Sequence, residues 1–291
     1  MSTHIGNTSE SEFLAADGTP LFVRDWPAGD CNARQGVVVM HGLGEHCGRY
    51  AHVAGFFNQL GFIVRTYDHR GHGQSGGRCG DLPDDSVVFD DARLLIDDFR
   101  QQLDGPPILL GHSMGGLFAA RFACAGMSPL RGLILSSPAL AVRMNGFQRG
   151  LLKIASALIP GVGLPNGLNA RYLSHDTEVI RAYRSDPLVH PRISAHLLHC
   201  MLNAMDYSHR HTAALRIPVL LLAAVEDHLV DPEGSRRFAA ALPDKLKTAH
   251  FYEGFYHEIF NELDATRVFD DVRVWLEQQK FTPILPDRQA A

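Results

Sequence analysis

The sequence predicts an α/β fold with a mostly parallel eight-stranded sheet flanked by helices. Six runs rich in apolar and β-branched residues occur along the chain, and helical patterns lie between most of them. Strands that read as nearly continuous apolar runs are typical of parallel sheets covered on both faces. The length of 291 residues suits one large core with an insertion and is short for two independent enzyme domains.

The first two strands are predicted as a hairpin within residues 12–26. Two short alternating segments flank Asp17-Gly18, a pair that favours tight hairpin turns. This hairpin gives the sheet an antiparallel edge. The six other strands are expected within residues 36–41, 62–68, 107–111, 130–138, 218–227 and 245–254. Sheets of this kind carry their sites beyond the carboxyl ends of the strands.

One long interval interrupts the alternation of strands and helices. Residues 142–211, which follow the sixth predicted strand, are too many for a crossover and read mainly as helix. We interpret them as a helical cap over the site, inserted between core parts 1–141 and 212–291. A second packing layer is the alternative. The segment 146–164 has an apolar face interrupted by Arg149 and Lys153, and an amphipathic helix over 268–279 closes the core.

The composition argues against several classes of protein. The formal net charge is −5, from 27 Lys and Arg and 32 Asp and Glu, and no basic stripe is present, so we expect no nucleic-acid partner. Five cysteines, an odd number without a C-x-x-C pair, suit a reducing cytoplasm. We expect neither export nor a membrane span, because the sequence has no signal-peptide pattern and no run of 18 apolar residues.

Ser113 lies at a predicted strand-to-helix turn, in the stretch ILLGHSMGGLF (residues 108–118). A turn this tight forces its central residue towards positive φ, and β-carbons would collide at the flanking positions Gly111 and Gly115. The hydroxyl then points into a site where the N–H groups that open the helix favour negative charge. The alternative is an ordinary glycine-containing turn in which Ser113 has no catalytic role. The strand before Ser113 and the helix after it favour a nucleophile.

A serine nucleophile needs an imidazole to take its proton and a carboxylate to orient that imidazole. In doubly wound hydrolases the acid and then the histidine follow the serine, each after the carboxyl end of a strand. Asp227 is the candidate acid because it ends the apolar run 218–227. Glu226 is expected to point to the opposite side, and Asp231, which precedes Pro232, is expected to cap a helix.

Two of the 16 histidines compete for the role of base near the last predicted strand. His250 lies inside the apolar run and is expected to pack on the sheet. His257 follows the break at Glu253-Gly254, in a loop that leads into the final helix. We therefore predict His257 as the base.

The residues HGLGE (41–45) follow the first parallel strand. Their glycines let the backbone approach a tetrahedral intermediate closely. We expect the amides of Leu43 and Met114 to bind its oxyanion. His41 is expected mainly to order the loop.

With these residues in place, the sequence resembles the monoacylglycerol lipase and lysophospholipase branch of the α/β-hydrolase superfamily. The likeness covers nearly the whole chain and rests on HGLGEHCGRY (41–50), YDHRGHGQSGG (67–77), GHSMGG (111–116), SDPLVH (185–190), EDHLVDPEGS (226–235) and YEGFYHEIFNE (252–262). It implies the α/β-hydrolase fold, Ser113, Asp227 and His257 as a catalytic triad, and a cap that takes up one acyl chain and rests transiently on lipid surfaces. The cap region matches poorly apart from SDPLVH.

We therefore predict an enzyme that cleaves the single acyl ester of monoacylglycerols through an acyl-enzyme, without cofactor or metal. A lysophospholipase, a short-chain carboxylesterase and a non-catalytic binding protein are the alternatives. Glu45 and Arg49 form either a polar edge of the site or a helix-opening salt bridge. The predicted substrate contacts are His41, Gly42, Glu45, Arg49, His112, Leu151, Ile154 and Leu158.

Four other histidines are candidate metal ligands by their spacing, but we do not expect them to bind a metal. His69 and His72, beside Asp68, are expected to hold their loop through hydrogen bonds. His196 and His199 have a spacing compatible with zinc, yet the sequence offers no third ligand.

Overall fold

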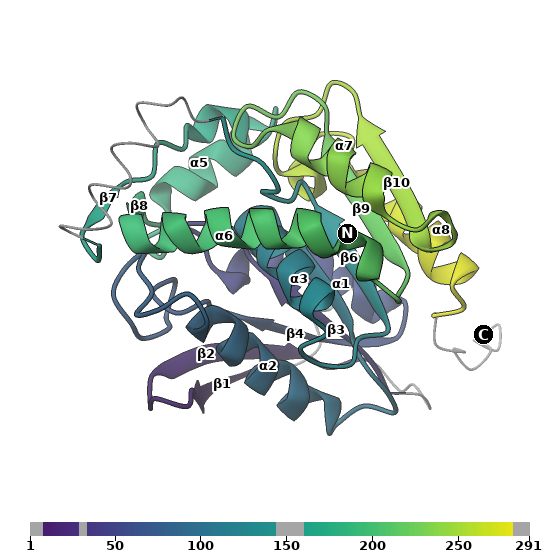
Figure 1. Ribbon diagram of the computed structural model, residues 1–291, viewed down its shortest axis with the longest axis horizontal. Coiled ribbons are helices and arrows are strands. Elements are labelled where there is room, and N and C mark those ends of the chain that lie inside the picture. The colour runs from purple at the N-terminus through teal and green to yellow at the C-terminus, as the bar shows by residue number, and fades with distance from the viewer. Residues whose placement is uncertain (1–7, 29–33, 144–159, 282–291) are drawn as a thin grey trace.

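The structure is a computed structural model that describes residues 8–28, 34–143 and 160–281. A twisted eight-stranded sheet runs through its centre (Figure 1). The strands are β1 (Ser9–Leu14), β2 (Pro20–Trp26), β3 (Gln35–Met40), β4 (Phe62–Tyr67), β5 (Ile108–His112), β6 (Gly132–Ser136), β9 (Val219–Ala224) and β10 (Lys247–Tyr252). Seven of them lie where the sequence predicted strands and extend beyond the predicted ranges by at most one residue, whereas β1 begins at Ser9, three residues before the predicted hairpin.

The order of the strands is β1-β2-β4-β3-β5-β6-β9-β10. The pairs β1–β2 and β2–β4 are antiparallel, and every other pair in this sheet is parallel. The prediction of a mostly parallel sheet with an antiparallel hairpin at one edge is therefore confirmed. Because β4 and β5 lie on opposite sides of β3, the strand order reverses there. Ligands of such sheets bind beyond the strand ends at this switch point.

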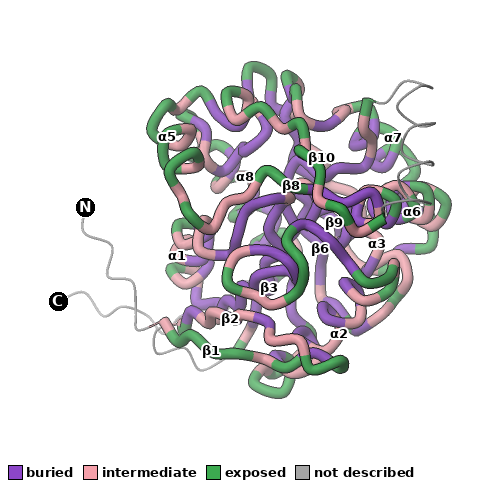
Figure 2. The backbone as a smooth tube through the Cα atoms, turned by 90° about the vertical axis from the view of Figure 1, so that its left-hand side faces the viewer, coloured by how far each residue is buried: buried purple, intermediate pink, exposed green. Residues whose placement is uncertain are grey.

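Helices cover both faces of the sheet (Figure 1). They are α1 (Ala51–Gln59), α2 (Val87–Arg100), α3 (Ser113–Ala125), α6 (Ala195–His211), α7 (Pro232–Ala241) and α8 (Ala265–Gln278). Helices α2, α3, α6 and α7 share one core with Leu109 of β5, whereas α1 and α8 share the other with Ile108 and Leu110. The central strands are buried and the exposed residues lie towards the periphery (Figure 2). Burial on both faces explains why these strands read as continuous apolar runs.

The chain between β6 and β9 is the long insertion, of which the structure describes residues 137–143 and 160–218. Its described part contains a two-stranded antiparallel pair, β7 (Gly163–Pro165) and β8 (Arg192–Ser194), with α5 (Thr177–Ser185) between them and α6 after it. Helix α6 packs on α3 (Figure 1). The two short strands were not predicted, because three-residue strands carry no periodicity. Leu151, Ile154 and Leu158 lie outside the described residues.

Hydrogen-bonding side chains define where several helices begin. Asp231 caps α7 ahead of Pro232, as the sequence predicted, by accepting from the amide of Glu233 at 3.2 Å. Ser194 caps α6 by accepting from the amide of Leu197 at 2.9 Å. None of the described helices is long and apolar enough to cross a membrane.

Candidate active site

Ser113 forms the turn between β5 and α3. Its φ of 53° lies in the left-handed region, as the sequence predicted. A β-carbon at Gly111 would overlap the carbonyl oxygen of Gly115. A β-carbon at Gly115 would in turn overlap the carbonyl oxygens of Met40 and His41. The two glycines therefore let the turn pack directly against the end of β3. As a result, Ser113 lies just beyond the carboxyl end of β5.

Replacing Gly115 with alanine is expected to destabilise the fold by about 3 kcal/mol, because the added methyl group overlaps backbone that is held in the sheet. Thermal unfolding followed by circular dichroism measures the change. Gly55 in α1 is a matched control, since an added β-carbon there meets nothing within 4 Å. Gly55→Ala should stabilise the protein by about 0.5 to 1 kcal/mol. Equal melting temperatures for the two variants would contradict this explanation of the turn.

His257 connects Ser113 to Asp227. Its Nε2 lies 2.8 Å from Ser113 Oγ and its Nδ1 lies 2.6 Å from Asp227 Oδ2. An ionised carboxylate only accepts hydrogen bonds, so Nδ1–H donates to Asp227 and Nε2 of the neutral ring accepts from the serine hydroxyl. The other carboxylate oxygen accepts from the amides of Leu229 at 2.8 Å and Val230 at 3.0 Å. Both oxygens of Asp227 are thus fixed in place.

Burial and charge act in opposite directions on this pair, whose members are each 3% exposed. Burial lowers the pKa of His257, but the charge of Asp227 and its hydrogen bond raise it more, so the pKa lies above its ordinary value. Burial raises the pKa of Asp227, yet the charge and hydrogen bond of His257 and the two amides hold that pKa below its ordinary value. The carboxylate is therefore ionised at neutral pH and stabilises positive charge on His257.

The competing side chains lie elsewhere. Glu226 is exposed and Asp231 caps α7. His250 lies in β10, with its Nδ1 3.5 Å from Asp271 Oδ2. Within the described residues, none of these three side chains hydrogen bonds to Ser113 or His257.

Residues 41–46, which we call the glycine loop, lie beside Ser113. A β-carbon at Gly42 would be 3.2 Å from Ser113 Cβ, so the loop and the serine are in contact. Among the described residues, no acceptor is paired with the amide of Leu43. The amide of Met114 lies in the first turn of α3, where N–H groups lack an intrahelical partner. Within the described residues, both amides therefore lie near Ser113 without an acceptor.

Arg49 bridges the glycine loop to the loop that carries His257. Its guanidinium donates to both oxygens of Glu258, at 2.7 and 2.8 Å, and to Glu45 Oε2. Glu45 Oε1 accepts from the amide of Gly42 at 2.5 Å and from the hydroxyl of Tyr50 at 2.6 Å. The salt bridge considered from the sequence is thus present, with Glu258 as a second partner. Burial raises the pKa of Glu258, but the charge and hydrogen bonds of Arg49 lower it more, to about 2.

His41 and His112 are buried beneath the site. His41 Nδ1 donates to the carbonyl of Gly42 at 2.8 Å, and Nε2 accepts from the amide of His69 at 2.9 Å. His112 Nδ1 lies 3.0 Å from Ser136 Oγ. Burial lowers the pKa of His41 well below its ordinary value and that of His112 to about 4. Both rings are therefore neutral at pH 7, and His41 orders the glycine loop.

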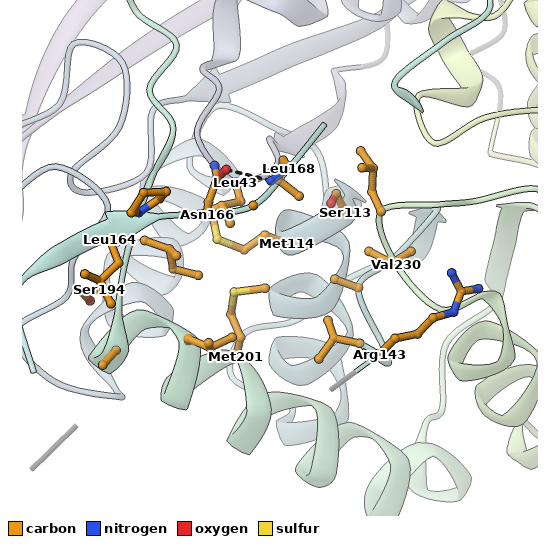
Figure 3. Close-up of a pocket in the computed structure, with 18 of the residues that line it drawn as sticks. Leu43, Ser113, Met114, Arg143, Leu164, Asn166, Leu168, Ser194, Met201 and Val230 are labelled. Carbon is orange, nitrogen blue, oxygen red and sulfur yellow. Dashed lines mark hydrogen bonds between the residues drawn. The ribbon is translucent and has the colours of Figure 1, made fainter. Parts of the chain in front are cut away.

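A cavity of about 530 Å³ with mostly apolar walls lies beside Ser113 (Figure 3). This volume is typical of small-molecule sites. The insertion supplies one wall and the loops after β6 and β9 supply others. The lining residues are Leu43, Ser113, Met114, Ala139, Val142, Arg143, Leu164, Pro165, Asn166, Gly167, Leu168, Ile193, Ser194, Ala195, Leu198, Met201, His228, Leu229 and Val230.

Few of the residues selected from the sequence line this cavity. Leu43, Ser113 and Met114 do, whereas the described substrate-contact candidates His41, Gly42, Glu45, Arg49 and His112 do not. The protein itself supplies partners for the polar groups of those five residues. The walls at 164–168 and 193–201 were missed, because their apolar residues look like ordinary core in the sequence.

His69 and His72 lie in the loop after β4, and His196 and His199 lie in α6. The expectation that the rings of His69 and His72 hold their loop through hydrogen bonds is wrong for His69, whose two ring nitrogens are buried without a partner among the described residues. It holds for His72 only at Nδ1, which lies 3.1 Å from the carbonyl oxygen of Arg70. Asp68 accepts from the amides of Cys47 and Gln74, each at 2.7 Å. His196 Nε2 lies 3.6 Å from Asp85 Oδ1. In the ranges that the structure describes, no three His, Cys, Asp or Glu side chains are arranged to hold a metal ion.

Comparisons with known proteins show which proteins this chain resembles. The family model described as serine aminopeptidase, S33, matches residues 32–264. The chain is 34% identical to a monoacylglycerol lipase of Mycolicibacterium smegmatis, over 92% of this chain and 96% of that protein. It is also 34% identical to the human monoglyceride lipase, over 92% and 90% of the two chains. The crystal structure of a monoacylglycerol lipase of Paleococcus ferrophilus superposes with a TM-score of 0.80 at 35% identity, covering 89% of this chain and 99% of that one.

Proposed function

The chain belongs to the serine aminopeptidase S33 family and has the fold of the α/β-hydrolases, and on this basis we propose that it hydrolyses monoacylglycerols to fatty acid and glycerol. The carboxylic ester hydrolase class follows from its relatives. The observation that carries the proposal is the hydrogen-bonded line from Ser113 through His257 to Asp227 at the edge of an apolar cavity.

Acylation begins when His257 Nε2 takes the proton of Ser113 Oγ as the oxygen attacks the ester carbonyl. The carbonyl oxygen becomes an oxyanion and accepts from the amides of Leu43 and Met114. His257 then gives its proton to the departing alcohol, and the acyl group remains on Ser113.

Deacylation repeats these steps with water. His257 deprotonates the water as it attacks the acyl-enzyme, the same two amides bind the second oxyanion, and Ser113 regains its proton as the fatty acid leaves. Asp227 remains ionised throughout, because its hydrogen bonds favour the carboxylate. No step needs a cofactor.

The apolar cavity supports a substrate with one acyl chain. Residues 142–211 act as its cap, and the described part of this cap supplies wall residues such as Leu164, Ile193 and Met201. The expectation that Leu151, Ile154 and Leu158 contact the acyl chain and lipid surfaces falls on residues outside those that the structure describes. We place the enzyme in the cytoplasm, since the four described cysteines are free thiols.

A lysophospholipid is the second candidate substrate, because Arg143 brings a guanidinium to the cavity wall. Its side chain is 59% exposed and lies 3.8 Å from Asp231 Oδ1, so it remains accessible to a phosphate. The overall charge of −5 favours the neutral monoacylglycerol.

Hydrolysis of a substrate panel by the purified protein tests the proposal. The panel contains a monoacylglycerol and a lysophospholipid with the same acyl chain, and p-nitrophenyl esters from acetate upwards. The monoacylglycerol should be cleaved fastest, with a kcat/KM of at least about 10⁴ M⁻¹s⁻¹. Faster cleavage of the lysophospholipid would favour the second candidate. An optimum at acetate, or no hydrolysis at all, would reject the proposal.

A further inference from the structure

The SDPLVH segment (residues 185–190) lies against the glycine loop. It connects α5 to β8 in the insertion, and the function proposed above gives it no role. The amide of His190 donates to the carbonyl of Gly44 at 2.8 Å, and Asp186 Oδ2 lies 2.8 Å from Nε2 of His46. His190 Nε2 lies 3.1 Å from the carbonyl oxygen of Gly71 in a neighbouring loop. Two residues of the segment, Asp186 and His190, thus hydrogen bond to the glycine loop.

The partners of His46 fix the direction of its bond to Asp186. His46 Nδ1 accepts from the amide of Gly48 at 3.2 Å, so the proton of the neutral ring is on Nε2, which donates to Asp186. The other oxygen of Asp186 accepts from the amide of Leu188 at 2.9 Å. Burial raises the pKa of Asp186, but these hydrogen bonds hold it below its ordinary value, so Asp186 is an ionised acceptor.

Gly44 makes the contact possible. Its φ is +76°, and any β-carbon there would overlap the carbonyl oxygen of His190. The two stretches of backbone therefore touch without side chains between them. On the other side of Leu43, the amide of Gly42 donates to Glu45 Oε1 at 2.5 Å. The amide of Leu43 is consequently held between two tethered glycines.

We propose that the SDPLVH segment positions the glycine loop for oxyanion binding, with Asp186 and His190 as positioning residues. The inference rests on the proposed function, in which the amide of Leu43 binds the oxyanion. Such donors act only when they are fixed in advance, because reorientation during the reaction forfeits the gain. The glycine loop therefore depends on its hydrogen bonds to the SDPLVH segment for the position of the Leu43 amide.

Asp186→Asn tests this role with little change of shape. Asp186 accepts with both oxygens, from His46 Nε2–H and from the amide of Leu188, whereas asparagine has only one acceptor oxygen. In either orientation of the introduced amide, its NH2 group faces one of these two donors and that hydrogen bond is lost. We expect kcat for a p-nitrophenyl ester to fall about 10-fold to 100-fold, with KM changed less than about twofold. Ser185→Ala is the matched control within the same segment and should keep wild-type activity. In the part of the chain that the structure describes, the Ser185 hydroxyl bonds only to the carbonyl oxygen of Ala182, within α5.

The affinity for an alkyl trifluoromethyl ketone distinguishes a misplaced oxyanion site from a general disruption of the active site. Ser113 Oγ adds to the ketone carbon, its proton passes to His257, and the ketone oxygen becomes an oxyanion bound by the same amides. Asp186→Asn should weaken this inhibitor by the same factor as kcat. The acid limb of kcat/KM should stay at the wild-type pH, since His257 and Asp227 are untouched.

Unchanged kcat and inhibitor affinity in a folded Asp186→Asn variant would overturn the inference, and so would a shifted acid limb. If that variant does not fold, His46→Leu removes the donor of the same hydrogen bond and carries the same expectations. Failure of both variants to fold would also overturn it, because a positioning role predicts folded but slow enzymes. A wild-type protein that hydrolyses no ester would instead reject the proposed function itself.

Discussion

Replacing Ser113 with alanine is expected to reduce kcat for ester hydrolysis by a factor on the order of 10⁴ to 10⁶. The substitution removes the atom that forms the acyl-enzyme in the proposed mechanism, while the amides of Leu43 and Met114 and the cavity remain. Hydrolysis of a long-chain p-nitrophenyl ester by the purified variant measures the loss. The melting temperature should stay close to that of the wild type, since alanine lacks only the hydroxyl.

Ser137→Ala is the matched control. Like Ser113, Ser137 has a positive φ, 36°, at the end of a neighbouring strand. Ser137 is buried, and its hydroxyl accepts from the amide of Ala224 at 3.4 Å. Its variant should retain activity within a few-fold. Comparable rates for the two variants would remove Ser113 from the chemistry.

Replacing Asp227 with asparagine is expected to lower kcat about 10⁴-fold. An amide can donate to the ring, which allows the tautomer with its proton on Nε2, and that tautomer cannot accept the proton of Ser113. The variant also loses the negative charge that stabilises protonated His257. Glu226→Gln is the neighbouring control, because Glu226 is exposed, and it should be fully active.

The same variant should shift the pH dependence. His257 must be neutral to act as a base, so kcat/KM falls as the pH drops through the pKa of His257. Asp227 holds that pKa above its ordinary value, so the acid limb of the wild type should lie above the ordinary pKa of a histidine. Asp227→Asn removes the cause of the rise, so its residual activity should persist to lower pH. An acid limb at the same pH in both enzymes would contradict the assignment of this pair.

Local patterns in the sequence were enough to predict much of the fold and the hydrogen-bonded arrangement of Ser113, His257 and Asp227. The parallel strands could be predicted because burial on both faces leaves continuous apolar runs. The turn at Ser113 could be predicted because its glycines are required by contacts within a few residues. Asp227 and His257 could be predicted because the chain order in a doubly wound sheet restricts where each partner can lie.

Contacts between distant segments were beyond that reasoning. Glu258 is paired with Arg49, 209 residues earlier in the chain, and nothing near either residue indicates the partner. The contact between His190 and Gly44 likewise joins the insertion to the core. The cavity wall at Leu164–Leu168 depends on how the insertion folds back over Ser113, which apolar periodicity does not encode.

Labelling with a fluorophosphonate, followed by tryptic digestion and mass spectrometry, tests the identity of the nucleophile most directly. The tryptic peptide of residues 101–121 contains Ser113 as its only hydroxyl side chain, so the mass of this peptide alone locates the adduct. We expect one phosphonyl group on this peptide in the wild type and none anywhere in Ser113→Ala. An unlabelled 101–121 peptide in active wild-type enzyme, or equal labelling of the alanine variant, would contradict the proposed chemistry.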